Sequence, residues 1–238
     1  MNRCRNASAH LFCILPYFRL AKRELHVYNG GVSRIQIYTG RSMGCNAYLI
    51  EGTDGYALVD APEGVAAWLA RTLPEGERVA HLLITHQHFD HVQDAAAVQE
   101  RYGCTMHAHS AYSTSLTLEE AAGGWGIPPV PAFHVDDAFG SSTPQADWAG
   151  LEWEIFSIPG HAPDGVAYLL RGEGCVFVGD ILFAGSVGRT DFPGGSMAQL
   201  VRGIRTHLMP LDPHTEVFSG HGPSTSIGEE LLNNPYIA

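Results

Sequence analysis

Apolar residues recur along this chain in short runs that glycine-rich turns separate. Alternating or continuous apolar runs of about four to eight residues are typical of strands, whereas a 3.6-residue period over about ten or more is typical of helices. Strands and helices are therefore expected to alternate in the first half. The pattern predicts strands at 33–39, 45–52, 55–61, 81–85 and 104–109, with helices at 62–72 and 92–103.

The second half repeats this alternation after a long irregular stretch. Residues 121–146 are rich in glycine, proline and acids, which predicts a loop that either covers a site or only connects two elements. Beyond it the pattern predicts strands at 151–158, 166–172, 175–180 and 215–220, a helix at 197–209 and a short tail containing GEELL.

Two similar halves of this kind predict an α/β fold, an αββα sandwich in which two mixed sheets pack face to face with helices outside. Residues 32–238 are expected to form one such domain. The loops at one edge of the sheets are then expected to carry the function.

Residues 1–31 differ from the rest of the chain. They are basic, contain one apolar run, LFCILPYF, and have their first acid at Glu24. Pro16 interrupts that run and basic residues follow it, which disfavours a secretory signal. We expect a loosely ordered arm or a start codon placed too far upstream. No segment reaches the roughly 18 to 20 apolar residues of a membrane span.

Composition narrows the range of partners. The formal net charge is −11 and only 14 residues are Lys or Arg, which disfavours nucleic acid and anionic membrane surfaces as partners. A hydrophobic content of 45% allows a sizeable core. We therefore expect a globular protein that acts on a small molecule, with a homo-oligomer left open.

The five cysteines are odd in number, widely spread and without a C-x-x-C pair. This pattern predicts neither a disulfide framework nor a thiolate zinc site. It is typical of a reducing compartment, so a cytoplasmic location is expected.

The segment THQHFDH, residues 85–91, concentrates metal-binding side chains at the end of a predicted strand. His86 and His88 are two apart, so in extended chain both face one side and can reach one cation. Asp90 and His91 follow where the chain turns into the helix expected from Val92, and they would face a neighbouring position. Imidazole and carboxylate ligands suit Zn, Fe or Mn.

Three later segments offer further ligands, each in a turn after an apolar strand and a glycine. They are PGH with His161, GD with Asp180 and GH with His221. A small residue before the ligand lets the backbone approach a crowded centre. A second H-x-H pair, His107 and His109, has no carboxylate near it in sequence and is not expected to bind metal.

Taken in order, these motifs resemble the metallo-β-lactamase superfamily over residues 35–238. The resemblance implies an αββα fold and a site for two divalent metal ions, zinc first, with Fe or Mn as alternatives. Asp180 would bridge the two metals. The other ligands would be His86, His88 and His161 for one metal, and Asp90, His91 and His221 for the second.

Within that superfamily, residues 182–196 and the segment GHGPSTSIGEELLNNPY resemble small glyoxalase II-like hydrolases, which are similar to hydroxyacylglutathione hydrolase. Asp180 stands where β-lactamases of this fold usually carry Cys, which disfavours antibiotic hydrolysis. The helical C-terminal domain of glyoxalase II proper is not matched, so the acyl group is left open. GRTDF, residues 188–192, also resembles the mononuclear iron persulfide dioxygenases. A lactonase or phosphodiesterase is a further alternative.

The resulting hypothesis is hydrolysis of a glutathione-linked thiolester by a metal-activated hydroxide. Asp90 and Asp180 are expected to stay ionised beside the cations, and so to act in catalysis as ligands rather than proton donors. Arg189 can either bind a substrate carboxylate or pair with Asp191. Phe192 is an aromatic candidate for the pocket, but core packing is the more usual role of such a residue.

Overall fold

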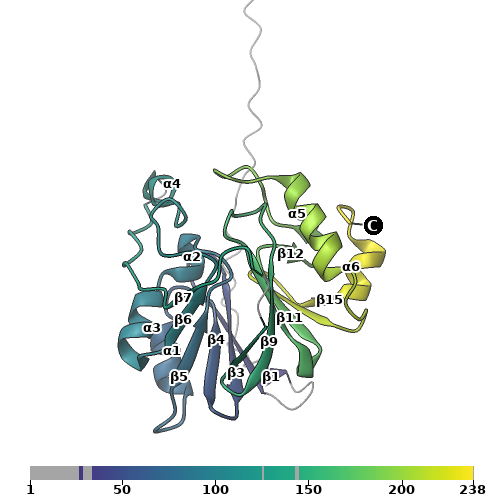
Figure 1. Cartoon of the computed structure of the whole chain (residues 1–238). Coiled ribbons are helices and arrows are strands. Elements are labelled where there is room, and N and C mark those ends of the chain that lie inside the picture. Colours follow the sequence, from purple (N-terminus) through teal and green to yellow (C-terminus); the bar gives the residue numbers. More distant parts are fainter. Residues whose placement is uncertain (1–26, 29–33, 125, 143–144, 238) are drawn as a thin grey trace, which may run out of the picture.

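Two sheets packed face to face, with helices on their outer faces, form the architecture of the computed structural model, which describes residues 27–28, 34–124, 126–142 and 145–237 (Figure 1). The predicted arm at 1–31 lies almost wholly outside the described residues. The αββα prediction is confirmed.

The first sheet contains seven strands in sequence order, antiparallel from β1 to β4 and parallel from β4 to β7. Its strands are β1 (Val27–Tyr28), β2 (Ile35–Thr39), β3 (Asn46–Gly52), β4 (Gly55–Val59), β5 (Val79–Leu83), β6 (Thr105–Ala108) and β7 (Asp137–Ala138). The helices of this half are α1 (Val65–Thr72), α2 (Phe89–Val92), α3 (Ala95–Tyr102) and α4 (Glu119–Gly124).

The second sheet contains six strands in the order β15-β14-β11-β10-β9-β8, with one parallel pair, β11 and β14. Its strands are β8 (Gln145–Trp148), β9 (Leu151–Ser157), β10 (Val166–Leu170), β11 (Cys175–Gly179), β14 (Glu216–Ser219) and β15 (Thr225–Ser226). A hairpin of β12 (Leu182–Phe183) and β13 (Ser186–Val187) lies apart from it. The helical segments are a 3₁₀ turn (Arg171–Glu173), α5 (Met197–Gly203), a π-helical turn (Ile204–Leu208) and α6 (Ile227–Asn233).

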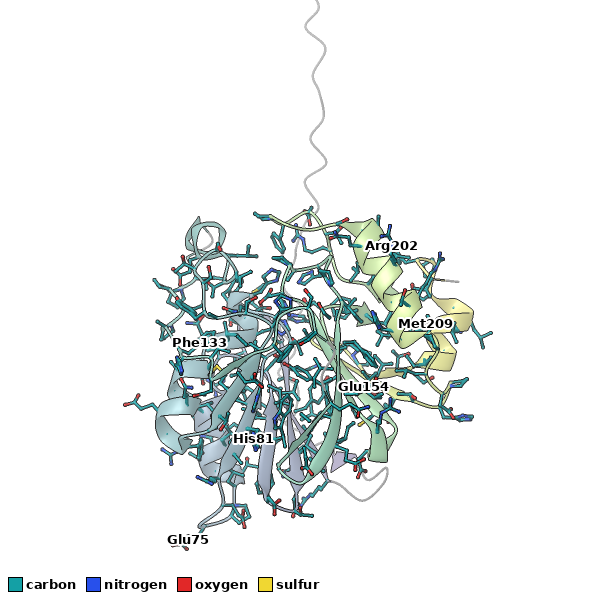
Figure 2. All side chains as sticks on the ribbon, in the orientation of Figure 1. Glu75, His81, Phe133, Glu154, Arg202 and Met209 are labelled. Carbon is teal, nitrogen blue, oxygen red and sulfur yellow. The ribbon has the colours of Figure 1, made fainter. Side chains whose placement is uncertain are left out.

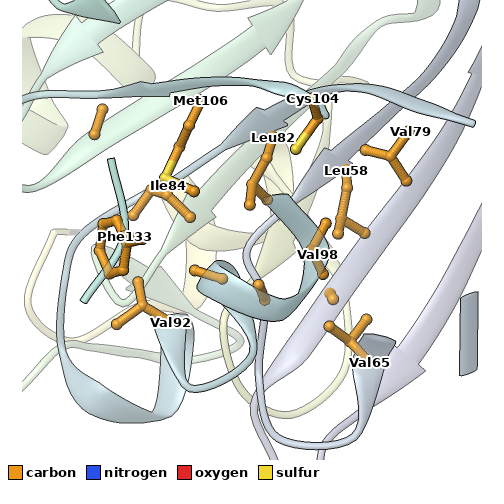
Figure 3. Packing of buried hydrophobic residues seen from close by; sticks show 14 of the residues in the cluster. Leu58, Val65, Val79, Leu82, Ile84, Val92, Val98, Cys104, Met106 and Phe133 are labelled. Atoms are coloured by element: carbon orange, nitrogen blue, oxygen red, sulfur yellow. The ribbon is translucent and has the colours of Figure 1, made fainter. Parts of the chain in front are cut away.

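Alternation of side chains along the strands creates three apolar layers. In β3, Leu49 faces the helices of the first half, whereas Tyr48 and Ile50 face the second sheet. The outer layer of the first half packs Leu58, Leu82 and Ile84 against helical residues such as Val65, Val92 and Val98, as Figure 3 shows. The matching layer of the second half covers its sheet with α5, the π-helical turn and α6. Each sheet is therefore covered on both faces.

The helix predicted at 92–103 is two helices, and this prediction was wrong at its start. α2 already begins at Phe89, and Gln93 and Asp94 separate it from α3. The carboxylate of Asp94 accepts hydrogen bonds from the backbone N–H groups of Gly64 and Ala66. It thus satisfies free donors at the first turn of α1, a contact between distant residues that the local pattern does not reveal.

Three other predictions need correction. The loop expected at 121–146 includes the end of α4, strand β7 and the start of β8. The helix expected at 197–209 changes to π-helical geometry at Ile204. The tail forms α6, which begins where the Ser226 side chain accepts a hydrogen bond from the N–H of Glu229.

The layer between the sheets offers a test of the packing. Phe177 in β11 is fully buried, and its ring lies 5.2 Å from Phe218 and 5.2 Å from Tyr48 of the first sheet. Phe177→Ala is expected to lower the free energy of unfolding by about 3–5 kcal/mol, because it opens a cavity between the sheets. Urea unfolding measures the change. Leu232→Ala, at a side chain that is 78% exposed, is the control and should change it by less than about 0.5 kcal/mol; equal effects would contradict the prediction.

Candidate metal centre

The histidine-rich segment lies between the end of β5 and the first turn of α2. His88 is the residue before the helix, so His86 and His88 belong to the extended connection and Asp90 and His91 to the helix itself. The sequence placed Asp90 just before a helix that starts at Val92, but Asp90 lies inside α2. Its Oδ2 is 3.1 Å from Nε2 of His221.

A first group of ligand atoms comes from His86, His88 and His161. One ring nitrogen from each lies within 4.8 Å of the others, and all three side chains are buried. Nε2 of His161 is 2.9 Å from Nδ1 of His88. Two of these imidazoles come from the first half of the chain and one from the loop after β9, so the sandwich brings together residues far apart in sequence.

A second group surrounds His91. Its Nε2 lies 3.3 Å from Oδ1 of Asp180, and Nε2 of His221 lies 3.6 Å from the same oxygen. Asp90 completes this group through its contact with His221. Asp180 and His221 follow β11 and β14, which are parallel neighbours, so both side chains emerge at one edge of the second sheet.

The carboxylate of Asp180 lies between the two groups. Its Oδ1 faces His91 and His221, while its Oδ2 lies 3.5 Å from Nε2 of His161. One carboxylate with an oxygen toward each group is the arrangement that a bridging ligand requires. All seven residues predicted from the sequence are therefore brought together.

The polar atoms of this cluster are arranged for a cation. Among the described residues, buried Nε2 of His86, Nε2 of His91 and Oδ1 of Asp180 have no hydrogen-bond partner. A buried polar atom without a partner costs roughly 1–3 kcal/mol, and a bound metal would remove that cost. Nitrogen and oxygen donors at these spacings fit zinc, iron or manganese.

Burial, and then the neighbouring imidazoles, lower the pKa of His88 from 6.5 to about 3 and that of His86 well below 6.5. Burial would raise the pKa of Asp180, but the adjacent histidines more than offset this and hold it below its usual 3.8. Neutral imidazoles beside an ionised carboxylate are the protonation states in which these groups bind a metal.

His91 differs from the other histidines of the cluster. Burial disfavours its charged form, but the nearby Cys45 sulfur and the carboxylates of Asp180 and Asp60 raise its pKa well above 6.5. A metal that binds Nε2 of His91 must therefore displace a proton.

Two neighbours orient the imidazoles and were not predicted. Asp60 Oδ2 accepts from Nδ1 of His91 at 2.8 Å, and the same carboxylate accepts from the backbone N–H and hydroxyl of Thr85. The carbonyl of Arg189 accepts from Nδ1 of His161 at 2.7 Å. When these two rings are neutral, their single proton is therefore on Nδ1, and Nε2 points at the cluster as an acceptor.

Asp164 was also missed. Its Oδ2 accepts from the backbone N–H of Gln87, between the two histidines of the motif, at 3.0 Å. Burial raises the pKa of Asp164 from 3.8 to about 6. The contact fastens the His86–His88 connection to the loop that carries His161. This role of Asp164 could not be predicted from the sequence, because a single aspartate three residues after a ligand forms no recognisable motif.

The glycines before the ligands allow the close approach that the sequence predicts. A Cβ on Gly220 would lie 2.6 Å from Cε1 of His91 and closer still to Asp180. Gly160 has a φ of 140°, and a Cβ there would lie 2.5 Å from the backbone nitrogen of Leu200. Only glycine fits at these two positions.

Arg189 and Phe192 lie at the rim of the cluster. Nε and Nη2 of Arg189 donate to Asp191 at 2.7 and 2.6 Å, and its guanidinium lies 4.3 Å from the ring centre of Phe192. Phe192 in turn packs edge-on against His88. Of the two roles open for Arg189, the ion pair is the one present. Substrate binding by Arg189 stays a prediction, and a substrate carboxylate would compete with Asp191.

The second H-x-H pair lies outside the cluster. His107 stacks on Trp148 and contacts His81 at 3.0 Å and Asp137 at 3.3 Å, while His109 contacts Ser110. His81 lies toward the end of the strands opposite α2 (Figure 2). Neither His107 nor His109 belongs to a group of described side chains that could hold a metal.

The cysteine pattern did not predict a thiolate zinc site, and one thiol nevertheless lies beside the cluster. Sγ of Cys45 lies within 4.8 Å of ring nitrogens of His91 and His221. The absence of a C-x-x-C pair was the reason for the prediction, but here the fold, not sequence proximity, supplies the neighbours. Cys45, Cys104 and Cys175 are all free and buried in the part of the chain that the structure describes.

A sequence profile of the metallo-beta-lactamase superfamily matches residues 40–221, which include all seven predicted ligands. The chain belongs to the metallo-beta-lactamase superfamily. Hydroxyacylglutathione hydrolase GloC of Haemophilus influenzae is 33% identical over 195 residues, which cover 81% of this chain and 92% of that protein. The resemblance stated from the motifs is thereby confirmed.

Two solved structures of this superfamily are similar to the chain. BLEG-1, a B3 metallo-beta-lactamase, has a TM-score of 0.77 at 28% identity and covers 86% of this chain and 99% of its own. TTHA1623 in a di-iron-bound form has a TM-score of 0.74 at 32% identity, with 84% and 99% covered. The chain is thus a member of a metallo-hydrolase superfamily with a His/Asp cluster suited to divalent metals. None of its described helices is long and apolar enough to span a bilayer.

The contact between Asp60 and His91 gives a test of the cluster that changes none of the seven residues. Asp60→Asn would turn an amide N–H toward Nδ1 of His91. Nδ1 would then have to accept this hydrogen bond, so the proton of the neutral ring would move to Nε2 and occupy the position at which a metal binds. Asparagine tolerates the left-handed φ of 60° at this position. We expect metal affinity to fall about 10- to 100-fold, measured by competition with a chromophoric chelator. Asp137→Asn, which changes the carboxylate beside His107, is the matched control. Equal affinities of the two variants would contradict the assigned role of Asp60.

His107 gives a test of stability against pH. Burial lowers its pKa from 6.5 to about 4. Between these values the unfolded chain binds the proton more readily, so the stability that neutral His107 contributes is present above pH 6.5 and is lost as the pH falls toward 4. In chelator-treated protein, the difference in unfolding free energy between wild type and His107→Gln should shrink from pH 7 to pH 4.5 on urea titration. Leu232→Ala, which removes no titratable group, is the control, and its difference from wild type should stay constant over this pH range. A constant difference for His107 as well would refute the assignment.

Proposed function

We propose that the chain is a dinuclear metal hydrolase that cleaves thiolesters, with glutathione-linked thiolesters as the first candidates. The observation that carries this proposal is the carboxylate of Asp180, which has Oδ2 at 3.5 Å from His161 and Oδ1 at 3.3 Å from His91. A site built for one cation would not need a carboxylate directed to two groups of imidazoles.

In this proposal each half of the cluster holds one metal. Asp180 would be held in common by the two cations, with one oxygen toward each group of histidines, and zinc is the first candidate for both. The di-iron form of TTHA1623, at 32% identity, supports iron as an alternative, and manganese suits the same donors. The remaining ligands are His86, His88 and His161 for the first metal, and Asp90, His91 and His221 for the second.

Two divalent cations at these positions would lower the pKa of a shared water toward neutrality and polarise a substrate carbonyl. The residues of the chain would orient the ligands and set their protonation states. Asp60 and the Arg189 carbonyl fix the tautomers of His91 and His161, and Asp180 and Asp90 remain ionised. These two carboxylates would therefore act as metal ligands, and neither carries a proton that it could give to a leaving group.

This proton balance favours a thiolester as substrate. A thiol has a pKa of about 8.5, so a thiolate leaves as a stable anion without a general acid. An amine or alkoxide leaving group would need a proton at the moment of bond cleavage. The similarity to GloC, which is named as a hydroxyacylglutathione hydrolase, supports the same substrate class.

A second candidate is a mononuclear iron dioxygenase of persulfides. The segment GRTDF at residues 188–192 favours it through its resemblance to those dioxygenases, and the Arg189 and Phe192 of this segment lie at the rim of the first group of histidines. The two candidates differ in metal count and in the use of oxygen.

The experiment combines elemental analysis of the purified protein with hydrolysis of S-lactoylglutathione. We expect about two metals per chain, and we expect His86→Ala and Asp180→Asn to lower turnover by more than about 100-fold, since loss of a ligand should exceed the loss of an orienting neighbour. His109→Ala, taken from the other H-x-H pair, should retain activity and metal.

Three outcomes would count against the proposal. One iron per chain with rapid oxygen uptake on glutathione persulfide would favour the dioxygenase. Full activity of the His86 variant would remove the metal role. Preferential hydrolysis of a chromogenic cephalosporin, a lactone or a phosphodiester would move the substrate class elsewhere. The cephalosporin belongs in the panel because BLEG-1 is named as a lactamase.

A further inference from the structure

Cys45 lies directly before β3, beside the turn that carries His221. The two residues form an antiparallel bridge, and the backbone N–H of the next residue, Asn46, donates to the carbonyl of Gly220 at 2.7 Å. The carbonyl of Cys45 accepts from the N–H of Gly40, also at 2.7 Å. The position of the thiol is therefore determined by backbone bonds on both sides and does not depend on a flexible loop.

The surroundings of Cys45 differ from those of the other buried cysteines. Cys104 belongs to the apolar layer under α1 and α3, and Cys175 to the layer between the sheets. Cys45 is only 1% exposed, yet it belongs to none of the three apolar layers. Its Sγ lies 3.5 Å from the Asn46 carbonyl and close to two imidazoles. Hydrophobic packing thus explains Cys104 and Cys175, but it does not explain Cys45.

The neighbours of this thiol are themselves candidate ligands. Sγ of Cys45 and one ring nitrogen each from His91 and His221 all lie within 4.8 Å of one another. Ligands of one tetrahedral cation lie roughly 3.3–4 Å apart, given bonds of about 2.0 Å to nitrogen and 2.3 Å to sulfur. His91 is fully buried, and its Nε2 has no hydrogen-bond partner among the described residues. An unpartnered nitrogen beside a buried sulfur indicates a place for a cation.

We propose that Cys45 supplies a sulfur ligand to the second metal position, next to His91 and His221. This inference rests on the proposed metal centre. On binding, the S–H bond breaks, its proton goes to solvent, and a sulfur–metal bond forms, so that no oxidant or reductant is involved. The first position, formed by His86, His88 and His161, keeps only nitrogen and oxygen ligands.

The consequence is a difference in metal preference between the two positions. Thiolate is a soft ligand that favours zinc over manganese, whereas imidazole and carboxylate accept both. The second position should therefore select zinc more strongly than the first. Replacement of the sulfur by oxygen should reduce that selectivity and leave the first position unchanged.

Cobalt(II) provides the direct test, because a thiolate bound to cobalt(II) gives an intense near-ultraviolet charge-transfer absorption. Metal-free full-length protein is titrated with cobalt(II), and wild type, Cys45→Ser and Cys104→Ser are compared. We expect the absorption to develop with occupation of the second position in wild type and in Cys104→Ser, and to be absent in Cys45→Ser. Competition titrations should show zinc affinity at the second position lowered about 10-fold or more in Cys45→Ser, with manganese affinity little changed.

The outcomes separate this inference from the proposed function. Two cobalt ions bound to wild type without the sulfur absorption would overturn the role of Cys45 and leave the dinuclear centre intact. The same holds if Cys45→Ser retains the absorption or the zinc affinity of wild type. Failure of wild type to bind any cobalt or zinc would overturn both. If the Cys45 variant does not fold, a wild-type spectrum without the sulfur absorption would still overturn the inference.

Discussion

The structure depends on one electrostatic constraint, the crowding of five imidazoles and two carboxylates into a common space in which four of the imidazoles are buried and the other groups partly buried. Polar groups are removed from water here without enough hydrogen-bond partners, since three buried atoms of the cluster have no hydrogen-bond partner among the described residues. Such an arrangement is unfavourable without a cation and favourable with one. Neighbouring polar groups stabilise the cluster. Asp60, Thr85 and the Arg189 carbonyl hold the imidazoles in orientations that an isolated cluster would not keep.

The two sheets make this crowding possible because their strands end at a shared edge. β5 delivers His86 and His88, whereas β11 and β14 deliver Asp180 and His221 from the opposite sheet. Glycines at the turns remove the Cβ atoms that would otherwise hold the chains apart. The proposed function uses this edge, and the proposed sulfur ligand comes from the residue directly before β3, which pairs with His221 in the turn after β14.

The sequence predicted the alternation of elements and all seven residues of the cluster, because each lies in a local pattern of apolar strand, turn and polar ligand. It did not predict the break between α2 and α3, since that break depends on Asp94 reaching the first turn of α1. The β12–β13 hairpin was missed because strands of two residues show no alternation. Asp60 and Cys45 acquire their importance only from the pairing of distant segments, which no spacing along the chain encodes.

The aromatic layer between the sheets has a consequence for the chemistry at their edge. Tyr48, Phe177 and Phe218 are packed ring against ring, and they determine the thickness of the sandwich. Because Asp180 and His221 stand on one side of that layer and the histidine motif on the other, these rings act as a spacer that sets the separation of the donors. Residues in the loops at the rim can therefore change, and with them the substrates that fit, while the aromatic layer keeps the spacing of the metal-binding side chains constant.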